Sequence, residues 1–179
     1  MKAVLISTRP QWCEKIASGK KTIEVRKTAP KCETPFKCYI YCTKDRKNLL
    51  PIEHGKVLQK VNFWKNTDAY YGFGKVIGEF ICDKITEWKY LPDYEYDSEK
   101  IYYINSKDGE NTCLSYDEIE KYGKGKPLYG WHISDLKIYD KPKELSEFIS
   151  SKPKNKFRAH GDNLTRPPQS WIWVEDKNE

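Results

Sequence analysis

The chain has 179 residues, of which 38% are hydrophobic and 32% are charged, and its formal net charge is +6. This length suits one domain with its own buried core better than two full domains. No apolar run approaches the ~20 residues that a membrane-spanning helix needs, and the apolar run near the N-terminus is too short for a secretory signal. We therefore expect a cytoplasmic protein that does not enter a membrane.

The charges are divided unevenly along the chain. Residues 1–50 carry 12 basic and 4 acidic side chains, a net charge of +8, whereas residues 79–120 carry a net charge of −8. A basic N-terminal third is what a surface that binds a polyanion needs, and the acidic region would be kept away from such a surface. Lysines that only solvate the surface would give the same counts, so charge alone leaves both interpretations open.

The first predicted elements are a strand at 3–7 and a short helix at 10–18. Pro10 suits the first position of a helix, where its missing N–H costs nothing. Trp12 and Ile16 are four residues apart and therefore share one helix face. Gly19 then stands where a helix C-cap is favoured.

The stretch after this helix changes to the period of a strand. Ile23 and Val25 alternate with polar residues that include Glu24 and Arg26, which predicts a half-buried strand with polar side chains on its other face. Lys21 is two residues before Ile23, so in a regular strand it would point to the same face as Ile23 and Val25. It can join the polar side chains only if it lies in the turn before the strand becomes regular.

Later elements follow from alternation and from turn and capping residues. Strands are predicted at 22–27, 36–42, 75–85, 128–139 and 171–174, and helices at 115–122 and 142–148. Ser115 and Glu118 form a capping box that starts the helix at 115, and Gly123 ends it. Gly78 allows a bulge or a close backbone approach within its strand. Two long segments are predicted to be irregular, 43–72 with a hairpin at 57–64, and the basic 152–166.

Six cysteines without a signal segment indicate reduced thiols. Cys38 and Cys42 are close in sequence, but four residues of extended strand span about 13 Å, which is too far for a disulfide. A zinc site is disfavoured because Cys32, Cys38 and Cys42 lack a Cys-x-x-Cys pair and have no histidine nearby in sequence. We expect no metal and no cofactor.

The octet from Gly19 to Arg26 fits the pattern Gly-x-Lys-x-x-Glu-x-Arg, and at this match the chain resembles the ASCH family, a branch of the PUA-like superfamily. The flanking segments 5–12 and 35–42 strengthen the resemblance. Segments 74–80 and 164–171 are similar to the phage-associated members of that family.

The resemblance implies an α+β fold, a PUA-like small curved β-barrel with a few short helices packed at its ends. It also implies a cleft between barrel and helices that is lined by the Gly-Lys-Glu-Arg motif. Residues 43–72 and 86–127 carry no family motif. We therefore interpret them as insertions in a single ASCH/PUA-like domain that spans residues 1–179.

With the resemblance, the motif predicts a protein that recognises RNA or a nucleotide in this cleft. Arg26 offers a fixed fork of donors suited to a phosphate or a base edge, and Lys21 offers a movable charge. Glu24 can accept hydrogen bonds from a base. Without the resemblance, an ion pair in which Glu24 only holds Arg26 in place is the favoured interpretation. The predicted binding residues are Lys21, Glu24, Arg26, Arg9, Trp12, Arg166 and Trp171.

Aromatic and basic side chains together suit single-stranded or looped RNA, because aromatic rings stack on exposed bases. Trp131, His132 and Ser170 are further candidates of lower rank. Each tryptophan is also well explained as a core residue. The sequence shows no catalytic partner for His132. We therefore interpret it as a hydrogen-bonded strand residue and not as a catalytic base.

An enzyme is the alternative interpretation. The family includes amidohydrolases acting on N4-acetylcytidine, with a lysine at the position of Lys21 and a threonine nucleophile where this chain has Glu24. A carboxylate is a poor substitute for that hydroxyl in amide cleavage. In a ribonuclease, Lys21 and Glu24 would carry out acid–base catalysis and Arg26 would stabilise the phosphorane.

A third interpretation is a protein-interaction scaffold that binds a partner through the acidic, tyrosine-rich region 79–120.

Overall fold

The computed structural model describes residues 2–44, 73–92, 100–151 and 161–176. Its strands are β1 (Lys2–Thr8), β2 (Ile23–Arg26), β3 (Phe36–Cys42), β4 (Lys75–Trp88), β5 (Tyr90–Pro92), β6 (Lys100–Tyr102), β7 (Leu128–Glu144) and β8 (Trp171–Glu175). The helices of the described residues are α1 (Pro10–Ala17), α2 (Ser106–Thr112) and α3 (Tyr116–Gly123), and a 3₁₀ turn lies at Leu145–Glu147.

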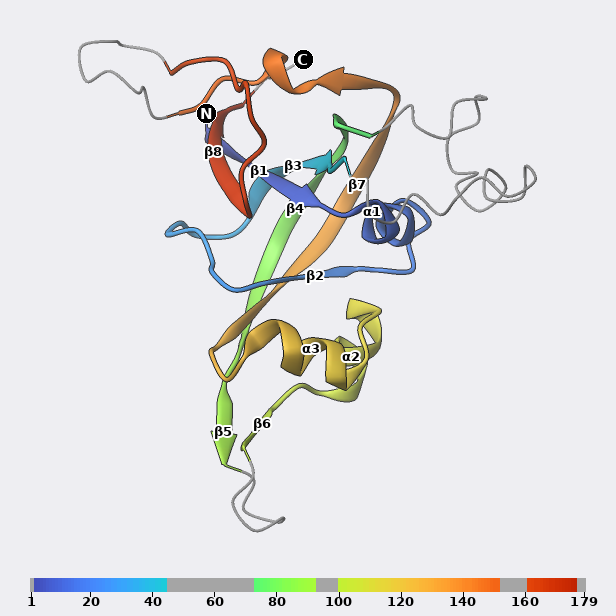
Figure 1. The fold of residues 1–179 in the computed structure, drawn as a ribbon, viewed down its shortest axis with the longest axis vertical. Helices are drawn as coiled ribbons and strands as arrows, with labels where there is room; N and C mark the ends of the chain where they lie inside the picture. Colours follow the sequence, from blue (N-terminus) through green and yellow to red (C-terminus); the bar gives the residue numbers. More distant parts are fainter. Residues whose placement is uncertain (1, 45–72, 93–99, 152–160, 177–179) are drawn as a thin grey trace.

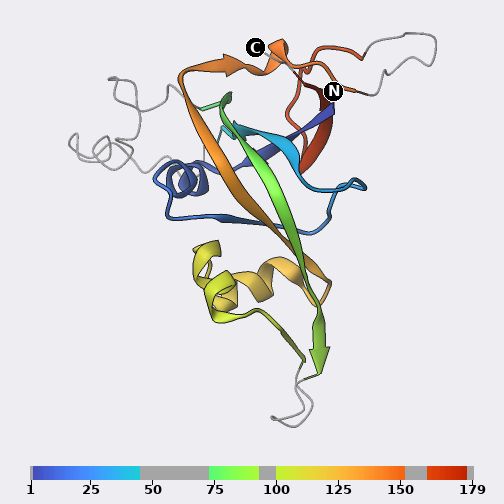
Figure 2. The same ribbon diagram turned by 180° about the vertical axis from the view of Figure 1, so that it is seen from behind.

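A six-stranded mixed sheet forms the centre of the molecule, in the order β2-β7-β4-β3-β1-β8. β1 and β3 are parallel, and the other neighbouring strands are antiparallel. β4 and β7 are long and continue beyond the other strands toward β5, β6, α2 and α3 (Figures 1 and 2). This arrangement confirms the predicted α+β class.

The barrel is not closed in the described part of the chain. β2 and β8 lie at the two ends of the strand order, and no backbone pairing joins them. A side-chain contact lies at this seam instead, because the indole nitrogen of Trp171 in β8 donates to Thr28 Oγ1, just after β2, at 2.9 Å. The expected barrel is therefore an open, curved sheet in these residues.

The alternation of β3 shows how the sheet divides the core. Cys38 and Ile40 point into the cluster that contains Ile16 of α1. Tyr39 points to the opposite face and packs against Phe148, with ring centroids 4.9 Å apart. Both faces of this strand are thus covered. Cys38 and Cys42 are free thiols in the core.

Two local predictions are confirmed in detail. The Ser115 hydroxyl accepts a hydrogen bond from Glu118 N, and the Glu118 carboxylate accepts one from Ser115 N, so the capping box starts α3 as expected. At Gly78 an added Cβ would lie 2.5 Å from the carbonyl oxygen of Lys137. The pairing of β4 with β7 also shifts register beside Gly78, so the glycine provides both a close approach and an irregularity.

The predicted helix at 142–148 is wrong. β7 continues to Glu144 because Lys143 and Glu144 pair with the start of β4, which leaves only one 3₁₀ turn after it. Pro142 is tolerated because it lies in the irregular part of the ladder, between the pairs made by Ile138 and Lys143. Tertiary pairing with β4 overrode the local helix signal.

Other predictions fall in part or in full outside the described residues. The hairpin at 57–64 and almost all of segment 43–72 lie there, as does the basic stretch 152–160. Within the described ranges, no helix combines the length and apolar character that crossing a membrane requires. In the same ranges, no group of three His, Cys, Asp or Glu side chains is placed to hold a metal ion.

Candidate functional site

Lys21 lies in the turn between α1 and β2, before the strand alternation begins, as it must if its side chain is to join those of Glu24 and Arg26. α1 ends at the Ser18 cap, and Gly19 adopts a φ of 73°, a conformation that favours glycine. The backbone N–H of Lys21 donates to the Lys15 carbonyl at 2.9 Å, and β2 begins only at Ile23. The turn thus frees Lys21 from the strand alternation and lets its amine join the polar side chains of β2.

All four residues of β2 are buried, so the prediction of a strand buried on one face only is wrong. Ile23 and Val25 pack in a cluster with Trp88 and with Ile119 of α3. On the other face, Lys21, Glu24 and Arg26 have exposed fractions of 2%, 6% and 5%. The sequence could not show this burial, because residues distant in the chain cover both faces.

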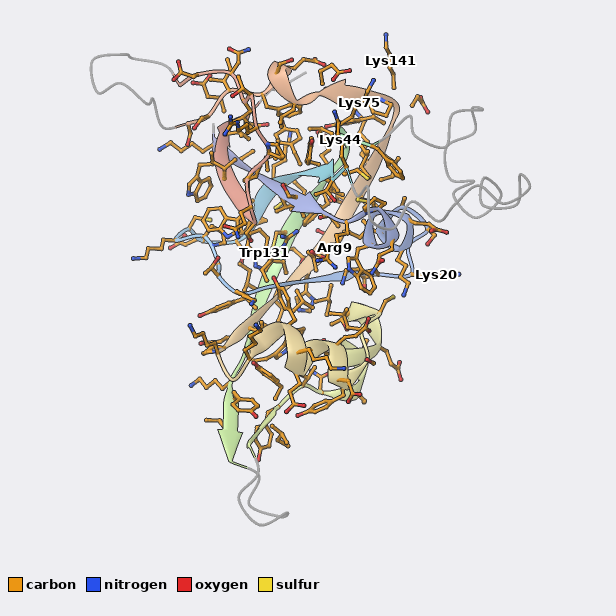
Figure 3. The ribbon with its side chains drawn as sticks, viewed as in Figure 1. Arg9, Lys20, Lys44, Lys75, Trp131 and Lys141 are labelled. Carbon is orange, nitrogen blue, oxygen red and sulfur yellow. The ribbon has the colours of Figure 1, made fainter. Side chains whose placement is uncertain are left out.

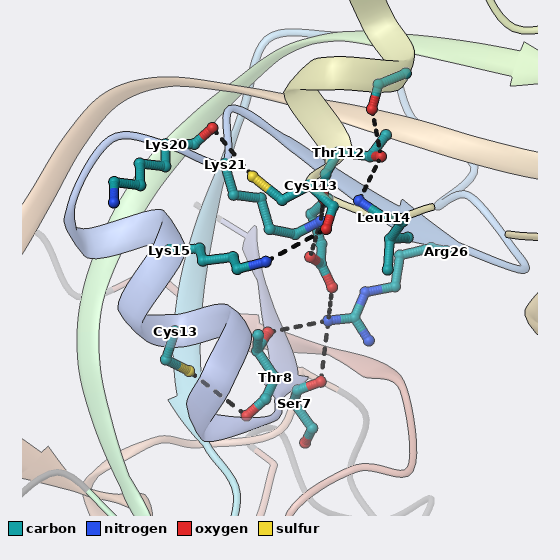
Figure 4. A network of polar contacts seen from close by, with 12 residues as sticks. Ser7, Thr8, Cys13, Lys15, Lys20, Lys21, Arg26, Thr112, Cys113 and Leu114 are labelled. Atoms are coloured by element: carbon teal, nitrogen blue, oxygen red, sulfur yellow. Dashed lines mark hydrogen bonds and ion pairs between the residues drawn. The ribbon is translucent and has the colours of Figure 1, made fainter. Parts of the chain in front are cut away.

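The three motif side chains form one ion-pair network (Figure 4). Glu24 Oε1 lies 2.9 Å from Arg26 Nη2, and Glu24 Oε2 lies 3.4 Å from Lys21 Nζ. Lys21 Nζ also donates to the carbonyl of Thr112, at the end of α2, at 2.7 Å. One carboxylate therefore separates two buried cations, and this geometry is why they can lie close together.

The Arg26 guanidinium joins three segments of the chain. Its Nη2 donates to the Ser7 carbonyl at 3.0 Å and to Thr8 Oγ1 at 3.1 Å, and its Nη1 donates to the Ser170 carbonyl at 3.3 Å. Arg26 Nε is buried and has no hydrogen-bond partner among the described residues. The side chain thus fixes the end of β1 and the segment before β8.

Burial changes the acid–base behaviour of the network. Loss of solvation lowers the pKa of the Lys21 amine, and the negative charge of Glu24 opposes that shift. The amine is therefore easier to deprotonate than a surface lysine. Because a proton acceptor and a cation lie beside it, the network has the composition of an acid–base site as well as that of a structural ion pair.

A cavity of about 500 Å³ adjoins this network. Its walls come from the end of β1, α1, β2, α3 and the segment before β8. The lining residues are Ser7, Thr8, Arg9, Gln11, Trp12, Lys21, Glu24, Val25, Arg26, Thr43, Leu114, Glu118, Lys121, Tyr122, Pro168 and Gln169. The buried motif thus lies at a hollow whose outer residues Arg9, Gln11 and Lys121 are exposed. Figure 3 shows Arg9 among the side chains near α1 and β2.

Trp12 is the aromatic residue that α1 presents to this cavity. Its ring is half-buried, with Lys15 Nζ 4.8 Å and Lys21 Nζ 5.4 Å from the ring centroid. These cations are attracted to the ring face, which orients the indole against the motif. Trp12 is therefore placed to contact a ligand that enters the cavity.

The wall made by α2 and α3 was not predicted from the sequence. Lys15 Nζ donates to the Cys113 carbonyl at 3.4 Å, and the backbone N–H of Thr22 donates to the Asn111 carbonyl at 3.1 Å. These bonds and that of Lys21 hold residues 111–113 against the turn before β2. The segment 86–127, which was assigned to an insertion, thus completes the cavity with Lys121 and Tyr122. The capping box at Ser115 indicated the helix but not its position.

The structure separates the other predicted residues from the motif. Arg166 is exposed and is not part of the described cavity lining. Trp171 lines a different hollow together with Trp173. Trp131 is fully buried in the core (Figure 3), as the alternative interpretation of each tryptophan held. The backbone of Ser170, through its carbonyl, contacts Arg26.

His132 lies in β7 outside the cavity lining, and its Nε2 is 3.0 Å from Thr86 Oγ1. It is thus a hydrogen-bonded strand residue, which agrees with the interpretation favoured from the sequence.

Burial lowers the pKa of His132 below its usual 6.5, although the Asp108 and Asp83 charges oppose the shift. As the pH falls through about 6.5, the unfolded chain therefore takes up this proton before the folded one does. We expect the free energy of unfolding to decrease more between about pH 8 and about pH 5 in the wild type than in His132→Gln. Urea unfolding at both pH values measures this, and equal decreases would contradict it.

Comparison with solved structures shows the class of fold. An ASCH protein from Zymomonas mobilis is 19% identical over 97% of this chain and 87% of its own, with a TM-score of 0.52. A tyrosine-to-phenylalanine variant of that organism's ASCH protein is 21% identical over 98% of this chain and 91% of its own, with a TM-score of 0.57. A serine-to-alanine variant also has a TM-score of 0.57 at 21% identity, over 97% of this chain and 88% of its own.

Comparison with protein-family models and with curated proteins gave no match. The structural likeness shows that the chain shares the α+β fold of these ASCH structures. This confirms the ASCH resemblance and the α+β class, whereas the implied barrel is an open sheet in the described residues.

Proposed function

We propose that the protein binds RNA or a nucleotide in the cavity beside Lys21, Glu24 and Arg26. The observation that carries this proposal is the convergence of the motif with exposed basic residues and an aromatic ring on one hollow. Its volume of about 500 Å³ lies within the range of small-molecule sites, so a single nucleotide unit fits. The ASCH fold supports the same function by analogy.

The residues of the cavity divide into two roles under this proposal. Arg9 and Lys121 are exposed and attract the phosphate backbone, while Trp12 offers a ring face to a base. Lys21, Glu24 and Arg26 are too buried to act as a general electrostatic surface. They form the floor of the site, where the Arg26 fork fixes the walls and meets the part of the ligand that enters deepest.

The direct test measures, by fluorescence anisotropy, the binding of a labelled single-stranded RNA of about 12 nucleotides. We expect the affinity to decrease between about 50 mM and about 200 mM salt, because binding releases counterions from the phosphates. Arg9→Ala and Lys121→Ala should each reduce the salt slope by about 0.7.

Lys89→Ala is the matched control, since Lys89 is an exposed lysine outside the cavity lining. Its slope should equal that of the wild type. The proposal is wrong if the protein does not bind RNA, or if both cavity variants behave like the Lys89 control.

A hydrolase is the second candidate, and the lowered pKa of Lys21 beside Glu24 favours it. Denaturing electrophoresis of the RNA recovered from the same samples separates the two functions. Intact RNA indicates a binding protein. Fragments that disappear with Lys21→Ala, while the variant stays folded, indicate a ribonuclease, and release of acetate from N4-acetylcytidine would indicate an amidohydrolase.

The phage-associated type, the cytoplasmic location and the single domain over 1–179 stay predictions from the sequence. The same holds for a protein partner at region 79–120. The structure describes part of this region as β5, β6, α2 and α3, which pack beneath β2 (Figure 1).

A further inference from the structure

Two adjoining hollows lie along β8, and they share no lining residue with the cavity. One is about 370 Å³ and the other about 510 Å³, and they share Lys31 and Trp173. We call them together the β8 groove. The groove is lined by Lys2, Ala29, Lys31, Cys32, Glu33, Phe36, Ser150, Ser151, Trp171, Ile172 and Trp173.

The groove presents two indole rings that pack against the core but stay partly exposed. Trp171 and Trp173 are half-buried, whereas Trp88 and Trp131 are only 2% and 0% exposed. The rings of Trp171 and Trp173 are nearly perpendicular, at 88°, with centroids 6.0 Å apart. The hydrogen bond from Trp171 to Thr28 fixes one ring in orientation. A rigid, partly exposed aromatic pair is the kind of surface on which nucleic acid bases stack.

The charge at the groove suits a polyanion. Lys2 and Lys31 are exposed at its margin, and Glu33 is its one acidic lining residue among those described. Lys31 lines both hollows, with Trp173 in each and Trp171 in one of them. The groove thus combines stacking surfaces with a net positive margin, as sites for single-stranded nucleic acid do.

A short segment joins the groove to the cavity. Pro168 and Gln169 line the cavity, Ser170 accepts a hydrogen bond from Arg26, and Trp171 lines the groove. The loop after β2 also runs beside the start of β8, as the Trp171–Thr28 bond requires (Figures 1 and 2). A strand held in the cavity can therefore cross this segment and place its next bases on the indoles.

We propose that the β8 groove is a second subsite for the same single-stranded RNA, in which Trp173 and Trp171 stack bases and Lys31 contacts the backbone. This inference rests on the proposed function of the cavity, because continuity with it identifies the occupant. RNA longer than the cavity can hold is bound at both subsites, and a single nucleotide is bound only at the cavity.

Anisotropy with the RNA of about 12 nucleotides tests the groove, and Trp173→Ala is expected to weaken binding about 10-fold because one stacked base is lost. Trp173→Phe retains a ring and should recover most of the affinity. Because Trp173 also packs against the core, Lys31→Glu provides a variant that leaves the packing intact. Lys31→Glu should weaken binding more than Lys89→Glu, which makes the same charge change at an exposed lysine outside the groove.

The outcomes separate the groove from the cavity. If Arg9→Ala weakens binding but Trp173→Ala and Lys31→Glu do not, the cavity binds RNA and the second subsite is wrong. If the groove variants weaken binding and the cavity variants do not, the proposed function of the cavity and the continuity argument are both wrong. If Trp173→Ala weakens the binding of a single nucleotide as much as that of the long RNA, the groove does not act as a separate subsite.

Discussion

Glu24→Ala is expected to lower the free energy of unfolding by about 3–5 kcal/mol, because it leaves two buried cations without their counter-charge. Lys21 Nζ and Arg26 Nη2 both lie against this carboxylate, and all three side chains are almost fully buried. Urea unfolding of the wild type and the variant measures the difference.

Glu120→Ala is the matched control, because Glu120 is an exposed carboxylate on α3 outside the network. We expect it to change stability by less than about 0.5 kcal/mol. A Glu24→Ala variant that loses no more stability than this control would show that the ion pairs are not a structural requirement.

A triple replacement separates stability from binding. Lys21→Met, Glu24→Leu and Arg26→Met together remove all three charges while keeping apolar volume, and such exchanges are often neutral or stabilising. We expect this variant to fold but not to bind RNA. A triple variant that binds RNA as tightly as the wild type would assign the network a structural role only.

Arg26→Ala is expected to weaken RNA binding by about 100-fold, an effect within the range seen when a buried, hydrogen-bonded charge is removed at an interface. The guanidinium holds Ser7 and Thr8, which line the cavity, and the carbonyl of Ser170, which follows the lining residues Pro168 and Gln169. Its loss removes both a cation at the floor and the positioning of that wall. Anisotropy under conditions in which circular dichroism shows the variant to be folded measures the effect.

Arg166→Ala provides the comparison for this prediction. The sequence assigned Arg166 to the site, but the structure places it outside the described cavity lining. We expect a change of about twofold or less, as for an exposed substitution away from a specific contact. Equal losses in Arg26→Ala and Arg166→Ala would show that the cavity does not provide the main contact.

Local signals in the sequence predicted much of the fold because each was decided by nearby residues. The capping box at Ser115 placed the start of α3, and the alternation around Cys38 placed both faces of β3. The sequence also showed that Lys21 could join Glu24 and Arg26 only from a turn before the strand, and the turn at Gly19 provides this position. In each case short-range geometry and tertiary packing favour the same structure.

The parts that the sequence did not predict depend on residues distant in the chain. Burial of Glu24 and Arg26 requires the end of β1 and the segment before β8 to cover one face of β2. Tyr122 enters the cavity only because Thr112 and its neighbours dock on the turn before β2. Similarly, Trp171 was assigned to the motif, but the strand that carries it turns its ring into a different hollow.

The central claim is that RNA occupies the cavity beside the motif, and an NMR titration of the ¹⁵N-labelled protein with single-stranded RNA tests it most directly. We predict that the largest shift changes occur in lining residues from three separate segments, which are Arg9, Gln11, Trp12, Glu24, Val25, Arg26, Glu118, Lys121 and Tyr122. Shift changes confined to residues outside this set, or no changes at RNA concentrations that saturate the anisotropy signal, would contradict the claim.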